Sequence, residues 1–248
     1  MRREELHEMY QLEDRYWWFI GRRRIVHRFI ELYGPRGENL RILDAGCGTG
    51  GTLTALQDLG NVWGCDISHQ ALTLARTRGL SDLGLCSVTA LGFEDASFDV
   101  VVSCDVLEHV QRDALAVREM ARVLRPGGLL VVTVPAHMFL WSEHDEALEH
   151  LRRYEPAAFR ELLEGAGLRV EKMTEAVALA LPAVLLYRVW RRLSGREGRP
   201  RTSLVRLPRP LNRLLVWMLD VENAVIPYLS LPLGTSLVAA ASKPGDMQ

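Results

Sequence analysis

A glycine-rich stretch, residues 44–50, limits what this chain can fold into more than any other part of its sequence. It reads Asp-Ala-Gly-Cys-Gly-Thr-Gly, follows the largely apolar run 40–43 and precedes a helix-like stretch at 52–59. Glycines let the backbone approach a ligand closely, and the free N–H groups at the start of a helix attract negative charge. A strand, a glycine turn and a helix in this order therefore predict a binding site for a nucleotide-containing cofactor.

A second acidic residue supports this interpretation. The strand-like run 62–65 ends in Asp66, which lies 20 residues beyond Gly46. An acid at this offset is placed to accept hydrogen bonds from ribose hydroxyl groups. The glycine spacing, acid-x-G-x-G-x-G, differs from the G-x-G-x-x-G of dinucleotide-binding proteins. An NAD-dependent oxidoreductase, which the strand and the glycine loop alone would permit, is therefore the weaker alternative.

Short β-rich runs alternate with helical ones after residue 40. The runs are 40–44, 62–66, 83–87, 98–103 and 128–134. This alternation predicts right-handed crossovers and a mostly parallel sheet that is covered on both faces. Ligands of such sheets bind beyond the carboxyl ends of the strands, where Asp44, Asp66, Ser87 and Cys104 fall.

In these positions the sequence resembles the class I S-adenosylmethionine-dependent methyltransferases. The resemblance covers roughly residues 38–135 and rests on four elements at the family's spacing: 44–50, 98–103, 107–110 and 124–128. It implies an α/β, Rossmann-like, doubly wound fold with a seven-stranded sheet whose last strand is antiparallel. We expect a sixth strand near 168–173 and this last strand at 236–242. S-adenosylmethionine is the implied cofactor, and methyl transfer is the implied reaction.

The resemblance also assigns the residues that hold the cofactor. Asp44, Gly46 and Gly48 would hold its methionine half and Asp66 its ribose, while Ile67, Ser87 and Val88 would contact adenine, with Leu91 on the other side of the ring. The full expected set is Arg22, Asp44, Gly46, Cys47, Gly48, Asp66, Ile67, Ser87, Val88 and Cys104. Ser87 departs from the family, which usually has an aspartate there, so a charge-assisted hydrogen bond to adenine would be lost.

The N-terminal region reads as one helix over residues 4–33. Its second part places Phe19, Val26, Phe29, Ile30 and Tyr33 on one stripe together with Arg22. In the methyltransferases an N-terminal helix lies over the cofactor, so the methionine carboxylate is one partner for this cation. The alternative is an arginine at the edge of the stripe whose charged end reaches water.

The segment 137–154 follows the carboxyl end of a strand, so we expect it to border the acceptor site. Candidate general bases in it are His144, which Glu143 and Asp145 flank, and His150 with Tyr154 four residues later. These groups favour oxygen slightly as the acceptor atom. The alternative is that they only tie the loop to the sheet.

A metal site is considered at Asp105, Glu108 and His109, which would share one face if a helix began there. Some quinone-pathway methyltransferases look similar at this point. Helix capping by Asp105 explains the same pattern, and Leu-Glu-His is widespread in relatives that use no metal. The expectation is therefore that no metal is bound.

Composition and length favour one domain. With 248 residues, 48% of them apolar, the chain can bury a large core. We expect a single methyltransferase domain with four parts: a helical N-terminal lid at 1–38, a core at 39–175, a helical, arginine-rich insertion at 176–234, and the final strand and tail at 235–248. The start of the chain has no apolar signal-peptide core, no run reaches about eighteen apolar residues, and the four cysteines form no Cys-x-x-Cys pair. These features predict a cytoplasmic protein with free thiols.

The insertion suggests where the acceptor comes from. Residues 188–213 contain nine arginines and one acid, although the whole chain has a formal charge of −1. Apolar stretches at 176–190 and 211–225 flank them. Such a combination predicts peripheral contact with an anionic membrane, at its inner face, and a lipid-linked acceptor such as a polyprenoid. A solvated basic loop, a place in the core and a homodimer interface are the alternatives.

The helix expected at 211–225 has two distinct faces. Its apolar face holds Leu211, Leu214, Leu215, Met218, Leu219 and Val221, opposite Asn212, Arg213, Asp220 and Asn223.

The predicted function is methyl transfer from S-adenosylmethionine to a small-molecule or lipid-like acceptor. A non-catalytic cofactor-binding protein is the main alternative. Nucleic acid is not an expected partner, because the sequence contains no RNA-binding module and no Asn/Asp-Pro-Pro-Tyr/Phe motif.

Overall fold

The computed structural model describes residues 3–183, 185–186, 207–226 and 228–245. Most of the segment 188–213 therefore lies outside the described residues, and only its last part, 207–213, can be placed.

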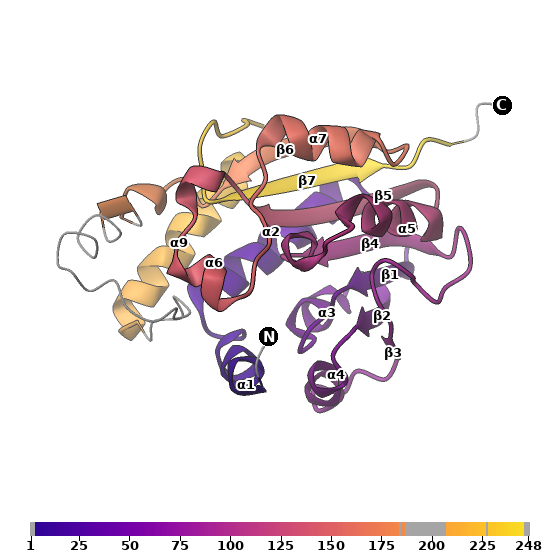
Figure 1. Ribbon diagram of the computed structural model, residues 1–248, viewed down its shortest axis with the longest axis horizontal. Coiled ribbons are helices and arrows are strands. Elements are labelled where there is room, and N and C mark those ends of the chain that lie inside the picture. Colours follow the sequence, from indigo (N-terminus) through magenta and orange to yellow (C-terminus); the bar gives the residue numbers. More distant parts are fainter. Residues whose placement is uncertain (1–2, 184, 187–206, 227, 246–248) are drawn as a thin grey trace.

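A single sheet forms the centre of the molecule (Figure 1). Its strands are β1 (Leu40–Ala45), β2 (Gly60–Asp66), β3 (Leu83–Leu85), β4 (Phe98–Cys104), β5 (Leu124–Pro135), β6 (Arg169–Ala176) and β7 (Ser236–Ser242). Their order is β3-β2-β1-β4-β5-β7-β6. Strands β1 to β5 are parallel, and β7 runs antiparallel to both β5 and β6. The predicted fold, with an antiparallel last strand, is confirmed.

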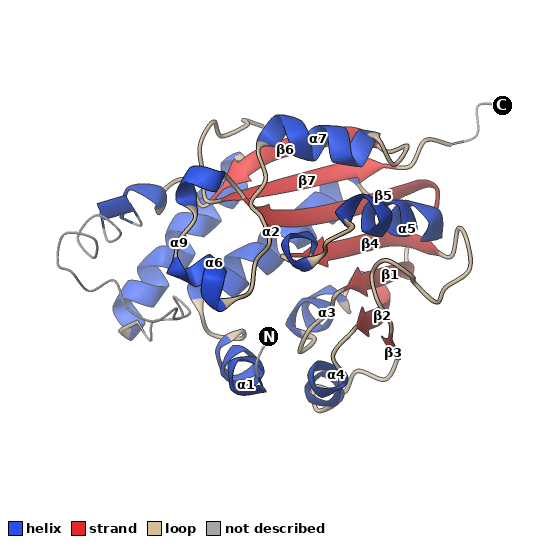
Figure 2. Ribbon diagram, viewed as in Figure 1, coloured by secondary structure: helices blue, strands red, loops and turns tan. Residues whose placement is uncertain are grey.

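Helices cover both faces of the sheet (Figure 2). They are α1 (Arg3–Leu12), α2 (Trp17–Tyr33), α3 (Gly51–Leu56), α4 (His69–Arg76), α5 (Asp113–Val123), α6 (Glu143–Ala147), α7 (Pro156–Glu164) and α9 (Arg209–Val225), with the 3-10 turns η1 (Leu107–His109) and η2 (Met138–Leu140). One face packs on α5 and α7, and the other packs on α2 and α9.

Strand β4 shows why the central strands are apolar throughout. Val101 packs with the α5 and α7 side, whereas Val100 and Val102 pack with α2, and all three are fully buried. A strand that is covered on both faces needs apolar residues at successive positions. The chain passes from β1 outward to β3 and then returns to β4 on the other side of β1, which opens a crevice at the carboxyl ends of β1 and β4.

The N-terminal helix is not continuous, contrary to the sequence-based expectation. It ends at Leu12 and restarts at Trp17, with Tyr16 in an extended conformation before the second helix. Distant groups replace the lost helical contacts: the side-chain oxygen of Asn212 accepts the N–H of Trp17 at 3.0 Å. The break is therefore stabilised by α9, which lies nearly 200 residues later in the chain.

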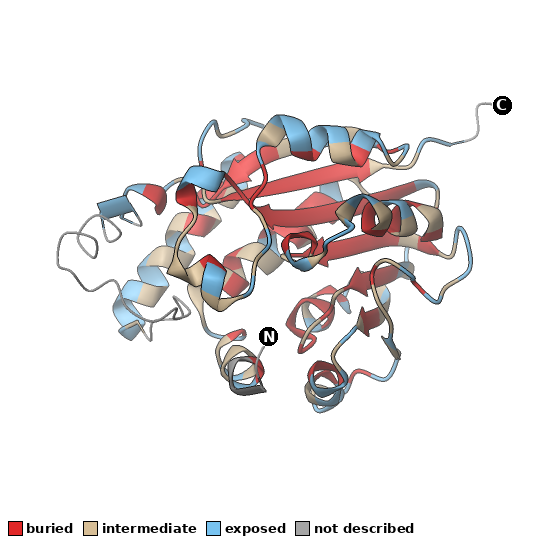
Figure 3. Cartoon of the chain, in the orientation of Figure 1, coloured by how far each residue is buried: buried red, intermediate tan, exposed pale blue. Residues whose placement is uncertain are grey.

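Helix α9 packs with the face that the sequence indicated as polar. Asn223 donates to the backbone oxygen of Gly21, and Asp220 forms an ion pair with Arg24. Gly21 permits this close approach, because a Cβ there would lie 2.2 Å from Leu219. Of the predicted apolar face, Leu219 is buried, but Leu211, Leu214 and Val221 are 40 to 49% exposed. Leu211, Leu214 and Val221 form an exposed apolar stripe with Trp217 and Val225. Figure 3 shows that exposed positions recur along this helix.

Membrane crossing has no support from the described part of the chain, where every helix is too short or too polar to span a bilayer.

Candidate functional site

A large cavity of about 1860 Å³ lies at the carboxyl ends of β1, β2 and β4. Residues of α1, α2, α6 and α9 form its other walls. Figure 1 shows where these helices lie relative to the sheet. Ligand pockets usually measure 300–1,000 Å³. This cavity is therefore large enough for two ligands side by side, as a transfer reaction requires.

The glycine loop forms one wall with its backbone. Gly46, Gly48 and Gly50 have φ values of +91°, +53° and +83°, which are unfavourable for other residues. A Cβ on Gly46 would also lie 2.4 Å from Val106. The loop is fixed by Asp66, whose carboxylate accepts the N–H of Gly48 at 2.9 Å and that of Ser68 at 2.7 Å. A carboxylate oxygen can accept more than one hydrogen bond, so Asp66 can also receive ribose hydroxyls.

Asp44 places a buried carboxylate on the cavity wall. It is only 1% exposed, and its Oδ1 has no hydrogen-bond partner among the described residues. Burial raises the pKa of Asp44 to about 7, with Arg22 opposing this and Asp66 adding to it. A buried acceptor without a partner is costly, so a ligand that brings a cationic donor would satisfy it.

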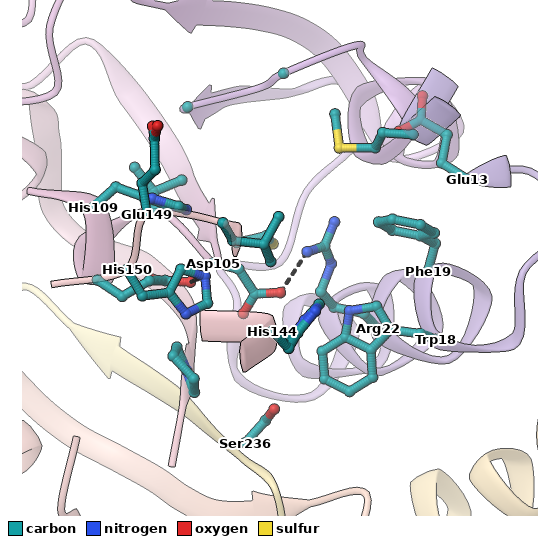
Figure 4. A pocket seen from close by; sticks show the side chains of 18 of the residues that line it. Glu13, Trp18, Phe19, Arg22, Asp105, His109, His144, Glu149, His150 and Ser236 are labelled. Carbon is teal, nitrogen blue, oxygen red and sulfur yellow. Dashed lines mark hydrogen bonds and ion pairs between the residues drawn. The ribbon is translucent and has the colours of Figure 1, made fainter. Parts of the chain in front are cut away.

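Arg22 also lines the cavity, close enough for its charge to act on Asp44. Its Nη1 donates to Asp105 at 2.6 Å, and its buried Nε has no partner in the described structure (Figure 4). Burial alone would lower the pKa of Arg22, but the charge of Asp105 outweighs this effect and raises it. The guanidinium therefore stays charged, and its free N–H can bind a carboxylate. The charges of Asp44 and Arg22 are thus complementary to the ammonium and carboxylate groups of a methionine moiety.

Asp105 itself is fully engaged. It adopts a left-handed backbone conformation, with φ of +53°, which is rare outside glycine. Its Oδ2 pairs with Arg22, and its Oδ1 accepts the hydroxyl of Thr133 at 3.0 Å. No helix begins at Asp105, since only the short turn η1 follows. The expectation that Asp105 caps a helix and shares a face with Glu108 and His109 is wrong.

The adenine end of the predicted site is partly as expected. Ile67 is 77% exposed and Val88 is buried, and both line the cavity together with Ser87, Cys47 and Cys104. The Ser87 hydroxyl is bonded to the hydroxyl of Thr89 at 2.8 Å. Leu91 instead packs in the core under α5 and is not one of the described lining residues. The predicted pairing of Ile67 with Leu91 around a ring therefore does not fit, because only Ile67 reaches the cavity.

Glu13 was not predicted to have any role. It is buried in the break between α1 and α2, where its Oε1 accepts the Thr49 hydroxyl at 2.6 Å and pairs with Arg78 at 2.6 Å. Its carboxylate also lies against Gly51, where a Cβ would come within 2.6 Å of it. Glu13 thus ties the end of α1 to the glycine loop. No local sequence pattern could reveal these contacts, because they join residues more than 35 positions apart.

Histidines gather in another part of the cavity wall (Figure 4). The ring centroids of His109 and His150 are 4.8 Å apart, and those of His144 and His150 are 6.3 Å apart. Burial and the nearby His150 lower the pKa of His109 to about 4, so its imidazole is neutral at pH 7. Glu108 is completely buried beside them, and desolvation followed by the charge of Asp105 raises its pKa well above the usual range.

Asp145 and Arg153 fix the orientation of His150. Arg153 makes a two-pronged ion pair with Asp145, with N–O distances of 2.8 and 2.9 Å, and His150 Nδ1 lies 3.0 Å from the same carboxylate. Although burial favours the neutral acid, the hydrogen bonds from His150 and Arg153 lower the pKa of Asp145 below the usual range.

The three candidate bases differ in position. His144 and His150 line the cavity, whereas Tyr154 is absent from the described residues that do so. The Tyr154 hydroxyl donates to Asp113 at 2.8 Å, and burial followed by this contact raises its pKa. It is 5% exposed and connects β5 to the start of α5. Its placement favours a structural role, against the catalytic one that the sequence suggested.

The far end of the cavity is apolar. Its described walls there are Ala180, Ala183, Leu185, Leu207, Leu211 and Leu215. Leu211 belongs both to this wall and to the exposed stripe of α9. The cavity therefore joins the polar cofactor corner to an apolar surface.

Comparisons with known proteins agree with this geometry. Residues 43–132 match a family described as a methyltransferase domain. The chain is 34% identical over 163 residues to a probable S-adenosylmethionine-dependent methyltransferase of Mycolicibacterium smegmatis, which covers 64% of this chain and 62% of that protein. It is 30% identical over 168 residues to a ubiquinone biosynthesis O-methyltransferase of Idiomarina loihiensis, covering 62% of this chain and 69% of the relative. The chain thus spans less than two thirds of the mycobacterial protein.

One solved structure shows the same architecture over nearly the whole chain. The methyltransferase in a complex with the Trm112 methyltransferase activator of Haloferax volcanii superimposes with a TM-score of 0.65, covering 99% of this chain and 96% of its own. At 20% sequence identity, this likeness shows the fold alone.

Proposed function

Because this chain belongs to the class I S-adenosylmethionine-dependent methyltransferases, we propose that it transfers the cofactor's methyl group to a hydroxyl group of an amphiphilic acceptor. The observation that carries the proposal is the single cavity that extends from the glycine loop to the leucines of α9. Its polar end suits the cofactor, its middle contains histidines, and its far end is apolar.

The corner at β1 and β2 binds the cofactor in this proposal. Asp44 receives the ammonium and Arg22 the carboxylate of the methionine half, because each has a buried polar atom that no described protein group satisfies. Asp66 receives the ribose, and Ile67 packs on the adenine. When bound, S-adenosylmethionine supplies an electrophilic methyl group on its sulfonium sulfur.

The middle of the cavity prepares the acceptor. A hydroxyl group attacks a methyl group efficiently only when a base removes its proton or weakens its O–H bond. The attacking oxygen must also be held within a few ångströms of the methyl carbon, in line with the methyl–sulfur bond. We assign proton removal to His144, which lies on α6 and lines the cavity. His150 is held in place by Asp145 and faces Glu108, so we assign to it the role of holding the acceptor.

The apolar end selects an acceptor with a hydrocarbon tail. Six apolar side chains form this wall, and Leu211 continues it onto the outer surface of α9. Along the described part of this wall, a tail can therefore leave the cavity without meeting a polar side chain. The relative named as a ubiquinone biosynthesis O-methyltransferase supports oxygen as the acceptor atom.

The surface of α9 brings the enzyme to such acceptors. The exposed stripe of Leu211, Leu214, Trp217, Val221 and Val225 is an unusual surface feature unless it contacts another apolar phase. The sequence adds the arginines of 188–213, of which Arg209 and Arg213 lie exposed on α9 itself. We infer peripheral binding to an anionic membrane, at its cytoplasmic face, as an interfacial helix does.

Methyl transfer can be tested with two matched acceptors. Isotopically labelled S-adenosylmethionine is incubated with the protein and a catechol that carries a prenyl tail, or with the same catechol without the tail, and products are analysed by mass spectrometry. We expect a methyl ether of the tailed catechol as the main product. Methylation on carbon or nitrogen would contradict the choice of oxygen, and no transfer to either acceptor would contradict the acceptor class.

A further inference from the structure

We propose that Glu108, His109 and His150 bind a divalent transition-metal ion in the acceptor half of the cavity. One ligand atom from each lies within 4.8 Å of the other two. Two of these residues belong to η1 and the third follows α6, so the fold brings the set together from segments about 40 residues apart. The proposal differs from the expectation drawn from the sequence, both in binding a metal and in replacing Asp105 with His150.

Glu108 provides the strongest support for the metal site. It is fully buried, and neither of its carboxylate oxygens has a hydrogen-bond partner in the described structure. Its nearest ion-pair contact is His150 Nε2, at 3.9 Å from Oε1. A buried carboxylate needs a counter-charge or ligand to offset its lost hydration. The charges of Arg22 and Arg153 act on Glu108 only from a distance, because the described ion pairs of these arginines are with Asp105 and Asp145. A divalent cation between Glu108 and the imidazoles would do so.

Both imidazoles have the supporting contacts that metal-binding histidines use. His150 is bonded through Nδ1 to Asp145, so its Nε2 is left facing Glu108. His109 forms a hydrogen bond with the backbone of Glu149. Metal ligands of this type usually bond to a carboxylate or a backbone carbonyl with the other ring nitrogen, which fixes the ring and its tautomer. Figure 4 shows His109, Glu149 and His150 grouped on one side of the cavity.

The ligand set also indicates which ions would bind. Two imidazoles and one carboxylate are typical of catalytic zinc and of iron(II), whereas magnesium and calcium prefer oxygen ligands. Donor atoms around one zinc ion lie about 3.3 Å apart, given bonds of about 2.0 to 2.1 Å. The observed separations therefore require shifts of at most about 1.5 Å.

Three protein ligands leave a coordination position open toward the cavity. The ion would hold the acceptor hydroxyl there and lower its pKa, as bound zinc does for water. The hydroxyl proton passes to His144, the oxygen–methyl bond forms, and the methyl–sulfur bond breaks, which leaves the thioether product of the cofactor. This catalytic role rests on the proposed methyl transfer, whereas the binding of the ion does not.

The test measures metal binding directly. Tag-free protein is treated with a chelator, dialysed and titrated with Zn²⁺ by calorimetry and with Co²⁺ by visible absorption. We expect one ion per chain, and d–d bands that report imidazole and carboxylate ligands. Glu108→Gln and His150→Ala should each weaken binding by about 100-fold or more, because each removes a ligand. His144→Ala, a nearby histidine outside the set, should change it by less than about twofold.

Two further measurements keep the outcomes separate. Thermal melts show that each variant is folded, and calorimetry with S-adenosylmethionine is done on the same preparations. Failure of the wild type to bind either metal at micromolar concentrations would overturn the metal site. Binding by Glu108→Gln and His150→Ala that is as tight as that of the wild type would also overturn it. Normal cofactor binding in that case would leave the proposed methyl transfer standing, whereas loss of cofactor binding by the wild type would contradict the proposed function instead.

Discussion

The two ends of the cavity differ in polarity. At the glycine loop, the wall consists of backbone N–H groups and carboxylates, and Asp66 alone fixes two N–H groups at 2.7 and 2.9 Å. At the other end, the described wall consists of leucines of α9 and of leucine and alanine side chains from 180–185 and 207, some of which are exposed. Fixed polar groups position one ligand in one orientation, whereas apolar surfaces accept tails of different length. The difference indicates strict recognition of the donor and looser recognition of the acceptor.

Helix α2 connects the two ends. Arg22 points into the cavity and pairs with Asp105, where the two side chains are 15% and 21% exposed. Arg24, two residues later, pairs with Asp220 on α9, where the side chains are 52% and 40% exposed. One helix thus carries a partly buried ion pair for the cofactor corner and an exposed one for the packing of α9. These two pairs allow the two regions to be tested separately.

The largest effect is expected from His144→Ala. Loss of a general base lowers turnover by about 10² to 10⁴ when the acceptor must lose its proton. Cofactor affinity should stay within about twofold, because His144 lies outside the glycine-loop corner. His69→Ala, an exposed histidine on α4, is the matched control and should retain full turnover. Steady-state kinetics with a catechol acceptor measure both. Full turnover in His144→Ala would remove this residue from the mechanism.

The second effect separates the two ion pairs of α2. Arg22→Met should weaken the binding of S-adenosylmethionine by about 10- to 150-fold, since a charge-assisted hydrogen bond contributes about 1.5 to 3 kcal/mol. Arg24→Met should leave the affinity unchanged, because its ion pair is exposed and faces α9. Calorimetry gives both values. Equal losses of affinity in the two variants would mean that cofactor binding depends on the position of α2 as a whole rather than on a contact with Arg22.

The third effect is a pH dependence that belongs to the polar end alone. The pKa of Asp44 is raised to about 7 by burial, so the carboxyl group is partly protonated in the cofactor-free protein at neutral pH. Only the ionised form pairs well with the methionine ammonium. Affinity should therefore fall about tenfold for each pH unit below 7. Asp44→Asn should bind more weakly at pH 8 but show a flat profile. A sloping profile in this variant would assign the titration to another group.

The smallest effect concerns the surface of α9. Trp217→Ser should reduce co-sedimentation with anionic vesicles about fivefold, because it removes the most exposed large side chain of the stripe. Binding should also fade at high salt, since arginines contribute to it. Leu85→Ser, which changes an exposed residue at the opposite edge of the sheet, is the control. If wild-type protein stays in the supernatant at low salt, the stripe belongs to a protein interface instead.

The sequence predicted the sheet and the glycine loop because their signals are local. Each strand is a short apolar run, and the loop between β1 and α3 needs glycine at positions with positive φ. The antiparallel β7 was found from the family resemblance rather than from its own residues. Asp44, Asp66 and Arg22 were expected on the cavity, and all three line it.

The rest could not be predicted because it depends on contacts between distant residues. The periodicity of α9 identified its apolar face but not its partner, and Asn212 and Asn223 proved to face α2. The break before Trp17 depends on Glu13 and on α9. Likewise, Glu108 and His150 meet only in the folded chain, so spacing suggested Asp105 instead.

If one cavity joins the cofactor to an acceptor tail, kcat/KM must depend on the presence of that tail. Wild-type enzyme should prefer a prenylated catechol over the tailless one by at least about tenfold, which corresponds to burying about two methylene groups. Leu211→Ser should lose most of this preference with the tailless rate unchanged, whereas Trp217→Ser, on the same helix but outside the described cavity wall, should keep it. The same preference in wild type and Leu211→Ser would contradict the account.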